Sequence, residues 1–525
     1  MHPRLRAIGG KIPLAMFIVV TAAFVVRLAM FMTNIGGVIF GKILWYDEAY
    51  SVFFAEHSLA EVIRFSGLDT TPPLFAVLLH FWTKAAGGSV LALSFFPFIF
   101  SVAAIPLVYL LAKEFFGARA GWLAALLVAL NPLHVKFATE IRTYSLIFCL
   151  AVLSLIFLRR FMDKRRTRDG LWWAAVSVLG MYAHYTFLFF FVLEDLYILA
   201  EMSVGRFKAV RKWLWLQAAT AAACLPLVFL FQRWSDLVYG GGAGNSYFSR
   251  AFGHGTPLSF LNYFAALFFG ERRFYAETWF WAIVSLGLGV LVIAWLAAAA
   301  WQRRGDRGAA LLAFMTFGGI VVFMAAGFIY DPRYYLIFVA PAVVLAASSL
   351  APARGWRLPA AVAAVVLCLF MPLTGALEVT PALTFKYYAP YFAEKLEVQE
   401  QSGDLLLLDH FSDTLFRLYY RGRSETKVFF PMRGRNATDM FERFRYFDYD
   451  LMAPADTATL AGLTAGHDRV WTIDYYPQRT SLQDPTGLKR RWFSENYLLK
   501  QAIEFPPGGE EPEAQKTLLL LYEKE

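Results

Sequence analysis

The chain has 525 residues, of which 58% are hydrophobic and only 17% are charged, and its mean hydropathy is +0.48. A soluble protein of this length has no interior large enough for so much apolar surface, so the composition excludes a soluble enzyme and indicates a polytopic membrane protein. The net charge of +9 does not indicate nucleic-acid binding, because the basic residues lie in short loops between apolar segments rather than in a separate basic domain.

Eleven segments are apolar enough to cross a bilayer, which takes about 20 mainly apolar residues. The first has a basic start and no small-residue cleavage site after it, so we expect a retained signal anchor. Segment 259–270 is apolar but short, and we expect it to lie at the interface or to cross only part of the bilayer. The predicted spans are 12–32, 92–112, 121–135, 143–159, 171–183, 186–202, 213–231, 278–301, 309–330, 334–351 and 358–376.

The distribution of basic residues predicts which side of the membrane each loop faces. If the N-terminus is cytoplasmic, the loops that then fall on the cytoplasmic side carry most of the Lys and Arg residues, whereas loop 33–91 has only Lys42, Arg64 and Lys84. This distribution follows the positive-inside rule. We therefore expect a multi-pass protein of the plasma (inner) membrane, with everything after residue 377 outside the cytoplasm.

The composition changes after residue 380, where charges become frequent and apolar runs shorten. Four short apolar runs are typical of buried strands, and helical segments are expected between them. The alternation predicts a small α/β domain. The chain is thus expected to form an α-helical transmembrane domain, 1–379, followed by an extracytoplasmic α/β domain, 380–525. The predicted strands are 405–408, 427–430, 470–473 and 518–521.

Loop 33–91 is too long and too aromatic for a plain connector. Apolar residues recur in it at helical spacing, which predicts two short amphipathic helices on the bilayer surface. Asp47 and Glu48 stand at the start of the first one. One carboxylate can act as a general base on an acceptor hydroxyl or amine, or the pair can bind a divalent cation. The alternative is a helix cap followed by a favourable first-turn charge.

Other outer turns also carry polar and aromatic residues, and we expect these turns to converge at one membrane level. On a helix, Arg142 and Glu140 would not face each other, which leaves Arg142 able to meet a phosphate or Asp47. Arg333 stands at an outer boundary against the charge rule, where an anionic lipid phosphate needs a cation. The alternative is anchoring in the interfacial belt. The candidate residues are Glu140, Arg142, Tyr144, His184, Tyr185, Arg333 and Tyr334.

At these residues the chain resembles the large GT-C membrane glycosyltransferases. The similarity is to the family 39-like group, with protein O-mannosyltransferases and the lipid A aminoarabinose transferase as relatives. It covers most of the membrane region. The residues that carry it are Trp45-Tyr46-Asp47-Glu48, Asp69-Thr70-Thr71-Pro72-Pro73-Leu74-Phe75 running into Leu78-Leu79-His80-Phe81-Trp82, Glu140-Ile141-Arg142-Thr143-Tyr144 and, more loosely, Asp331-Pro332-Arg333-Tyr334.

The resemblance implies a hexosyl or pentosyl transferase with an inverting reaction. Its donor would be a sugar linked to a polyprenyl phosphate, and its acceptor a lipid, glycan or protein at the outer face. The role of catalytic base, or of the group that orients the acceptor, falls on Asp47, with Glu48 in support. Further substrate contacts fall on Tyr46, Asp69, Pro72 and Pro73.

Arg142 and Arg333 are the candidates for binding the lipid phosphate. Relatives often carry His or Lys just before the Pro-Pro pair, where this chain has Thr71, so the phosphate is expected to rely more on the arginines. The relatives differ in metal dependence, which leaves a divalent cation open, and no other cofactor is expected.

Two other classes of function fit a chain of this composition. A flippase or transporter of polyprenyl-linked lipids usually has internal repeats and ionisable groups in the middle of the membrane, whereas the notable charges here lie at helix ends and in loop 33–91. A membrane-anchored scaffold would act through its tail. Deleting the tail is expected to abolish a scaffold's function but to leave an enzyme its membrane-embedded active centre.

Overall fold

The computed structural model describes residues 46–66, 71–239, 257–269, 279–325, 332–351, 388–408, 415–429, 453–474, 487–505 and 517–524, with positions 21, 25, 28, 44 and 412. The chain forms two compact units. The membrane unit is Met1–Phe40, Thr70–Phe231 and Ser246–Glu378; the tail unit is Gly41–Asp69, Gln232–Asn245 and Val379–Glu525. Part of loop 33–91 therefore groups with the tail. The predicted span 358–376, and 12–32 apart from isolated positions, lie outside the described residues.

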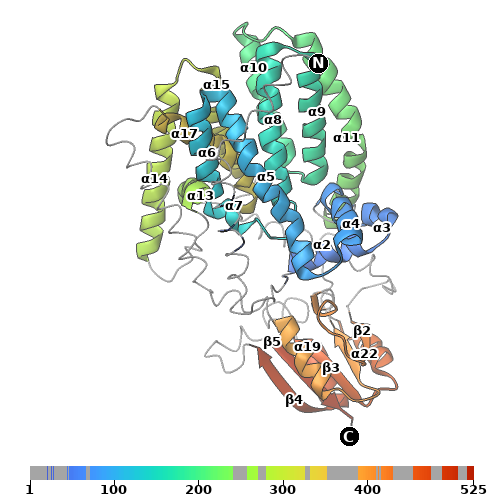
Figure 1. The fold of residues 1–525 in the computed structure, drawn as a ribbon. Coiled ribbons are helices and arrows are strands. Elements are labelled where there is room, and N and C mark those ends of the chain that lie inside the picture. The colour runs from blue at the N-terminus through green and yellow to red at the C-terminus, as the bar shows by residue number, and fades with distance from the viewer. Residues whose placement is uncertain are drawn as a thin grey trace. The chain divides into compact units, whose positions relative to one another are not determined.

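Helices make up the membrane unit (Figure 1). Six stretches of the described residues are long and apolar enough to cross a membrane, which confirms the polytopic membrane class. They lie in α5 (Val90–Phe116), α8 (Tyr144–Lys164), α11 (Val210–Tyr239), α14 (Trp279–Gln302), α15 to α16 (Arg307–Ala325, with a π-helical turn at Phe314–Gly318) and η2 with α17 (Pro332–Tyr335 and Leu336–Leu350). The shorter helices are α4 (Leu74–Ala86), α6 (Ala118–Ala129), α7 (Pro132–Lys136), α9 (Thr167–Ala183), α10 (Phe187–Ser203) and α13 (Pro257–Phe269).

The predicted span 121–135 is not one continuous helix, because α6 ends at Ala129 and the short α7 follows. Asn131 caps α7 by accepting a hydrogen bond from the His134 N–H at 2.9 Å. Its amide nitrogen also donates to the Leu267 carbonyl of α13 at 2.6 Å. Pro132 fits the first helical position, where no N–H is needed. The break thus ties α7 to the half-length helix α13.

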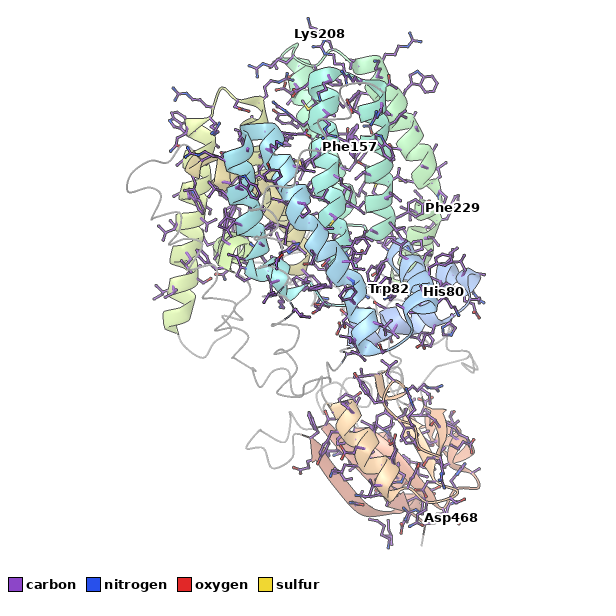
Figure 2. All side chains as sticks on the ribbon, in the orientation of Figure 1. His80, Trp82, Phe157, Lys208, Phe229 and Asp468 are labelled. Atoms are coloured by element: carbon purple, nitrogen blue, oxygen red, sulfur yellow. The ribbon has the colours of Figure 1, made fainter. Side chains whose placement is uncertain are left out.

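Helix α4 follows the Pro-Pro pair and was not predicted. Pro73 precedes its first residue and accepts a hydrogen bond from the Val77 N–H at 2.9 Å. The Trp82 indole N–H donates to the Ala92 carbonyl at 2.8 Å, which ties α4 to the start of α5; Figure 2 labels Trp82 and its neighbour His80. The turn between these helices begins at Gly87, whose φ of 87° favours glycine. These contacts hold α4 against the start of α5.

The middle of α10 carries a buried carboxylic acid that the sequence analysis did not weigh. Glu194 is fully buried, and both of its oxygens accept from the Ser154 hydroxyl of α8 at 2.8 Å. The Trp173 indole of α9 donates to the same group at 2.9 Å. A mid-membrane acid is also a feature of transporters. Here its partners are side chains of the two neighbouring helices, so Glu194 joins three helices.

Helices α13 and α14 approach each other closely at Gly289. A Cβ atom at this position would lie 2.1 Å from the backbone oxygen of Leu261, whereas a Cβ at Gly287 would meet nothing within 4 Å. The Ser285 hydroxyl donates to the Asn262 side-chain oxygen at 2.8 Å in the same contact. Only glycine permits this approach, because a backbone atom cannot move aside as a flexible side chain can.

We expect Gly289→Ala to lower the free energy of unfolding by about 1–3 kcal/mol through overpacking. Gly287→Ala is the matched control on the same helix. It should leave stability unchanged or raise it by up to about 1 kcal/mol, because alanine has the higher helix propensity. Thermal unfolding of both variants in detergent measures the difference. Equal melting temperatures for the two would contradict the close approach of α13 and α14.

The tail unit contains a five-stranded sheet in the order β2-β1-β3-β5-β4. Strand β1 pairs in parallel with β2 and β3, and β5 pairs antiparallel with β3 and β4. Successive residues of β1 belong to two different core clusters, so the sheet has a core on each face. The elements are α19 (Tyr388–Gln399), β1 (Leu405–Leu408), β2 (Glu425–Val428), α22 (Asp456–Thr464), β3 (Arg469–Asp474), α24 (Leu488–Asn496), β4 (Leu498–Phe505) and β5 (Thr517–Glu523).

This arrangement confirms the predicted α/β domain. Strand β2 lies two residues earlier than the predicted strand 427–430. Strand β4 was missed, because it is an edge strand whose side chains are exposed or half-buried and which therefore has no continuous apolar run.

The two predicted helices of loop 33–91 are present as α2 (Tyr46–Glu56) and α3 (Leu59–Ser66), both in the tail unit. Helix α3 starts with a capping box. The Ser58 hydroxyl and N–H both donate to the Glu61 carboxylate, at 2.7 and 2.9 Å, and the Glu61 N–H donates back to Ser58 at 3.4 Å. These hydrogen bonds separate α3 from α2 and fix where it begins.

Candidate active site

The acidic pair lies in the first turn of α2, as the sequence predicts. Asp47 is half-buried, and Glu48 has only 2% of its surface exposed. The Ser51 hydroxyl donates to the Asp47 carbonyl at 3.1 Å. The helix dipole favours negative charge at this end of α2. Tyr46 is the first residue of α2, and Asp69 lies outside the described residues.

A cluster of cationic and aromatic side chains lies within the membrane unit, where three turns meet. The turn before α8 supplies Arg142, whose guanidinium donates to the Thr71 hydroxyl at 3.2 Å. The Arg142 N–H donates to the Glu140 carbonyl at 2.6 Å, which fixes the turn locally. Arg142 therefore reaches the residue before the Pro-Pro pair.

Arg333 enters the same cluster from η2. Its guanidinium donates to the Tyr144 hydroxyl at 3.3 Å and stands over the Tyr144 and Tyr334 rings at 5.9 and 5.8 Å from their centroids. Tyr144 is 1% exposed, while Arg333 and Tyr334 are half-buried. The aromatic faces hold the guanidinium in place without neutralising its charge.

His184 lies close enough to Arg142 and Arg333 for both positive charges to act on it. Burial, and then the charges of Arg142 and Arg333, lower the pKa of His184 to about 3. The Thr186 N–H donates to its Nδ1 at 3.1 Å, so the proton of the neutral ring is on Nε2. Its ring packs 5.6 Å from Tyr334 and 6.1 Å from Tyr144. Near pH 7, His184 is thus a neutral N–H donor beside two cations.

The remaining predicted residues lie around this cluster or beside it. Pro72 and Pro73 are buried at the entry to α4, next to Thr71. The Tyr185 ring packs edge-on against Phe231 of α11, with 5.4 Å between centroids. This aromatic contact fits the interfacial packing weighed as the alternative for the turn residues. Sequence reasoning did not assign a role to Thr186, which orients the imidazole through both its N–H and its hydroxyl.

Chemically, the cluster is suited to an anion. Two guanidinium groups, a tyrosine hydroxyl and a neutral imidazole N–H are donors, and guanidinium groups bind phosphate oxygens in a fixed geometry. Among the described residues, no group of three or more His, Cys, Asp or Glu side chains is arranged to hold a metal ion. The described residues thus form a carboxylate pair on α2 and, separately, a cationic and aromatic cluster in the membrane unit.

The neutral state of His184 predicts a specific pH dependence. Because its pKa is about 3, the rate of a reaction catalysed at this site should show no inflection from this group between about pH 5 and 8. His184→Gln keeps an N–H donor and should keep the wild-type profile, whereas His184→Phe should lower the rate about 10-fold by removing a hydrogen bond to a charged group. Initial rates across this pH range test it. A wild-type inflection near pH 6.5 that disappears in His184→Gln would contradict the assignment.

Residues 70–231 match the family described as dolichyl-phosphate-mannose-protein mannosyltransferase. No curated protein matches the sequence. The fold is similar to that of the apo crystal structure of ArnT from Cupriavidus metallidurans, with a TM-score of 0.59 and 12% identity, over 95% of this chain and 97% of that one. It is also similar to the oligosaccharyltransferase AglB from Archaeoglobus fulgidus, with a TM-score of 0.53 and 13% identity, over 93% of this chain and 73% of that one.

At these identities the solved structures show a common fold, and the family match covers the segment from the Pro-Pro turn to α11. The chain thus shares its fold with ArnT and AglB, and its residues 70–231 match the mannosyltransferase family.

Proposed function

We propose that the protein transfers a sugar from a polyprenyl-phosphate donor to an acceptor at the outer face of the membrane. The observation that carries this proposal is the cluster of Arg142 and Arg333 around Tyr144 and the neutral His184. As the glycosidic bond breaks, negative charge develops on the departing phosphate. Fixed cations and hydrogen-bond donors lower the energy of that charge most strongly where water is excluded.

The similar structures support a polyprenyl-phosphate donor. ArnT from Cupriavidus metallidurans has been solved bound to undecaprenyl phosphate, and AglB from Archaeoglobus fulgidus in complex with a dolichol-phosphate and an inhibitory peptide. Both ligands combine a long isoprenoid chain with a phosphate. A lipid of this kind stays in the bilayer, where the helices of the membrane unit would meet it. The acceptor would be a lipid, a glycan or a protein.

In the proposed reaction, Asp47 accepts the proton of the acceptor hydroxyl or amine, and Glu48 supports it. The deprotonated oxygen or nitrogen attacks the anomeric carbon of the sugar. The bond from that carbon to the phosphate oxygen breaks, and the polyprenyl phosphate leaves with the electron pair, so the configuration inverts. Arg142 and Arg333 bind the phosphate before and after this step.

Transfer can be tested with the protein in lipid nanodiscs. Radiolabelled polyprenyl-phosphate sugars, several hexoses and pentoses among them, are offered together with a lipid extract and a peptide mixture as acceptors. We expect one donor to be consumed and its label to appear on an acceptor. Donor that binds but is never consumed, and that crosses the bilayer of proteoliposomes, would instead establish a lipid transporter.

A further inference from the structure

The acidic helix α2 is joined to the C-terminal part of the tail unit by a hydrogen bond just before its start. Leu44, just before α2, is 1% exposed, and its N–H donates to the Tyr419 hydroxyl at 2.7 Å. The two residues are 375 positions apart in the sequence. Because the Leu44 N–H is buried, removing its acceptor would leave it unsatisfied, which disfavours the present position of the chain.

A second attachment follows the acids. Ala49, directly after Glu48, is fully buried and belongs to the same core cluster as Phe392 of α19 and Trp471 of β3. Asp47 and Glu48 are therefore held between a hydrogen bond on one side and a packed core on the other. Burial, and then the charge of Glu48, raise the pKa of Tyr419, which keeps its hydroxyl neutral beside the acids.

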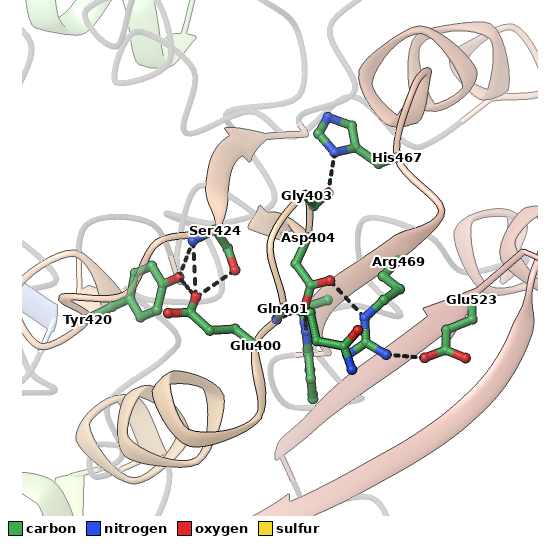
Figure 3. Close-up of polar contacts among 10 residues, drawn as sticks. Glu400, Gln401, Gly403, Asp404, Tyr420, Ser424, His467, Arg469 and Glu523 are labelled. Atoms are coloured by element: carbon green, nitrogen blue, oxygen red, sulfur yellow. Dashed lines mark hydrogen bonds and ion pairs between the residues drawn. The ribbon is translucent and has the colours of Figure 1, made fainter.

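The residues that follow Tyr419 are anchored at Glu400, which Figure 3 shows with Tyr420 and Ser424. Glu400, the residue after α19, accepts hydrogen bonds from the Tyr420 hydroxyl, from the Ser424 hydroxyl at 2.7 Å and from the Ser424 N–H at 3.0 Å. The Arg423 N–H donates to it at 2.8 Å. One carboxylate thus gathers the residues that follow Tyr419 and fixes them to α19.

Side-chain hydrogen bonds and an ion pair also join the strands of the tail unit's sheet. Asp404, 1% exposed, accepts from the Arg469 guanidinium and from the Trp471 indole, both at 2.8 Å, and Arg469 also pairs with Glu523 (Figure 3). These contacts join the start of β1 to β3 and β5. Crosslinks of this kind stiffen a sheet, and rigid supports hold functional groups more accurately than loops do.

From these contacts we infer that the tail unit positions the acidic pair, with Tyr419 as the positioning residue. The inference rests on the proposed function, in which Asp47 removes the proton of the acceptor. A shift of about 1 Å in a catalytic group can lower a rate by about 100-fold. Loss of the Tyr419 hydroxyl should therefore reduce kcat while leaving the binding of the lipid donor unchanged.

The test compares Tyr419→Phe with Tyr497→Phe. Tyr497 lies in the core on the other face of the same sheet, where its hydroxyl donates to the His467 carbonyl at 3.1 Å. Both variants lose one hydrogen-bonded tyrosine hydroxyl from the tail unit. We expect Tyr419→Phe to lower kcat at least about 10-fold with KM for the donor unchanged. Tyr497→Phe should keep the wild-type kcat.

Hydrogen exchange of residues 46–56 is measured in the same samples, because it reports on α2 without any assumption about the reaction. Exchange should rise in Tyr419→Phe and not in Tyr497→Phe. If the wild type transfers no sugar but exchange rises selectively, the positioning holds and the proposed function fails. If the wild type is active and Tyr419→Phe keeps its kcat, or if exchange does not rise, the positioning is overturned.

Deletion of the tail does not distinguish an enzyme of this design from a scaffold. Removing the tail also removes the partners of Leu44 and Ala49, so an enzyme of this design loses activity just as a scaffold would. The point substitution Tyr419→Phe leaves the tail in place and separates these cases.

Discussion

Replacing Asp47 with asparagine is expected to lower sugar transfer by about 10²–10⁴-fold, the range that a general base contributes. Asparagine is nearly isosteric but cannot accept the proton at neutral pH. Asp47 is half-buried at a helix start, where the amide still fits, so folding should be unaffected. Label transfer in nanodiscs gives the rate, and thermal unfolding in detergent reports the fold.

The matched control is Glu56→Gln, which removes one carboxylate from the exposed last residue of the same helix. It should transfer sugar at the wild-type rate. A chelator separates the two roles open to the acidic pair: a bound divalent cation would make the wild type as slow as Asp47→Asn, whereas a simple base is insensitive to it. Wild-type activity in Asp47→Asn would remove Asp47 from the mechanism.

The second large effect is expected from the arginines. Replacing Arg333 with methionine removes a guanidinium held over Tyr144 and Tyr334 and should weaken donor binding about 10–100-fold, because a hydrogen bond to a charged group contributes about 1.5–3 kcal/mol. Arg142→Met should act similarly. Arg333→Lys keeps the charge but loses the planar fork, so an intermediate affinity is expected.

Binding of polyprenyl phosphate to each variant in nanodiscs measures these losses. The control is Arg64→Met, an exposed arginine of α3, which should bind as the wild type does. In the double variant Arg142→Met with Arg333→Met, the losses should not add if both groups contact one phosphate, since shared partners couple substitutions. Full additivity, or no loss in either single variant, would contradict a shared phosphate site.

Local signals in the sequence predicted the long helices and most of the central strands. Apolar length marks a span such as α8, and a run such as Leu405–Leu408 marks a buried strand. The break at Asn131-Pro132 also has a local signal, a cap residue followed by proline, which the apolar content of the segment outweighed. Strand β4 has no such signal, because its place at the sheet edge removes the need for a continuous apolar run.

Contacts between distant segments were beyond prediction from one sequence. Glu194 is buried because Ser154 and Trp173 of other helices satisfy it, and nothing near Glu194 in the sequence indicates this. The same holds for Leu44 and Tyr419. The loop with the acidic pair was assigned to the transmembrane domain for its position in the chain, yet its segment Gly41–Asp69 groups with the tail unit.

For the candidate site, residue chemistry predicted more than spacing did. Arg142, His184 and Arg333 were chosen because cations and aromatics at outer helix ends suit a lipid phosphate, and the structure brings their three turns together. The contact of Arg142 with Thr71 was not predicted, since a threonine before two prolines carries no charge signal. The neutral state of His184 needs burial and two nearby charges, which only the folded chain provides.

The most direct test of the account is to measure free polyprenyl phosphate released from a bound polyprenyl-phosphate sugar, in wild type and Asp47→Asn side by side, with donor binding followed in the same nanodiscs. We expect the wild type to release polyprenyl phosphate in equal amount to the glycosylated acceptor. Asp47→Asn should bind the donor equally well and release almost none. Release by the variant at the wild-type rate, or binding without release by the wild type for every donor and acceptor, would contradict the account.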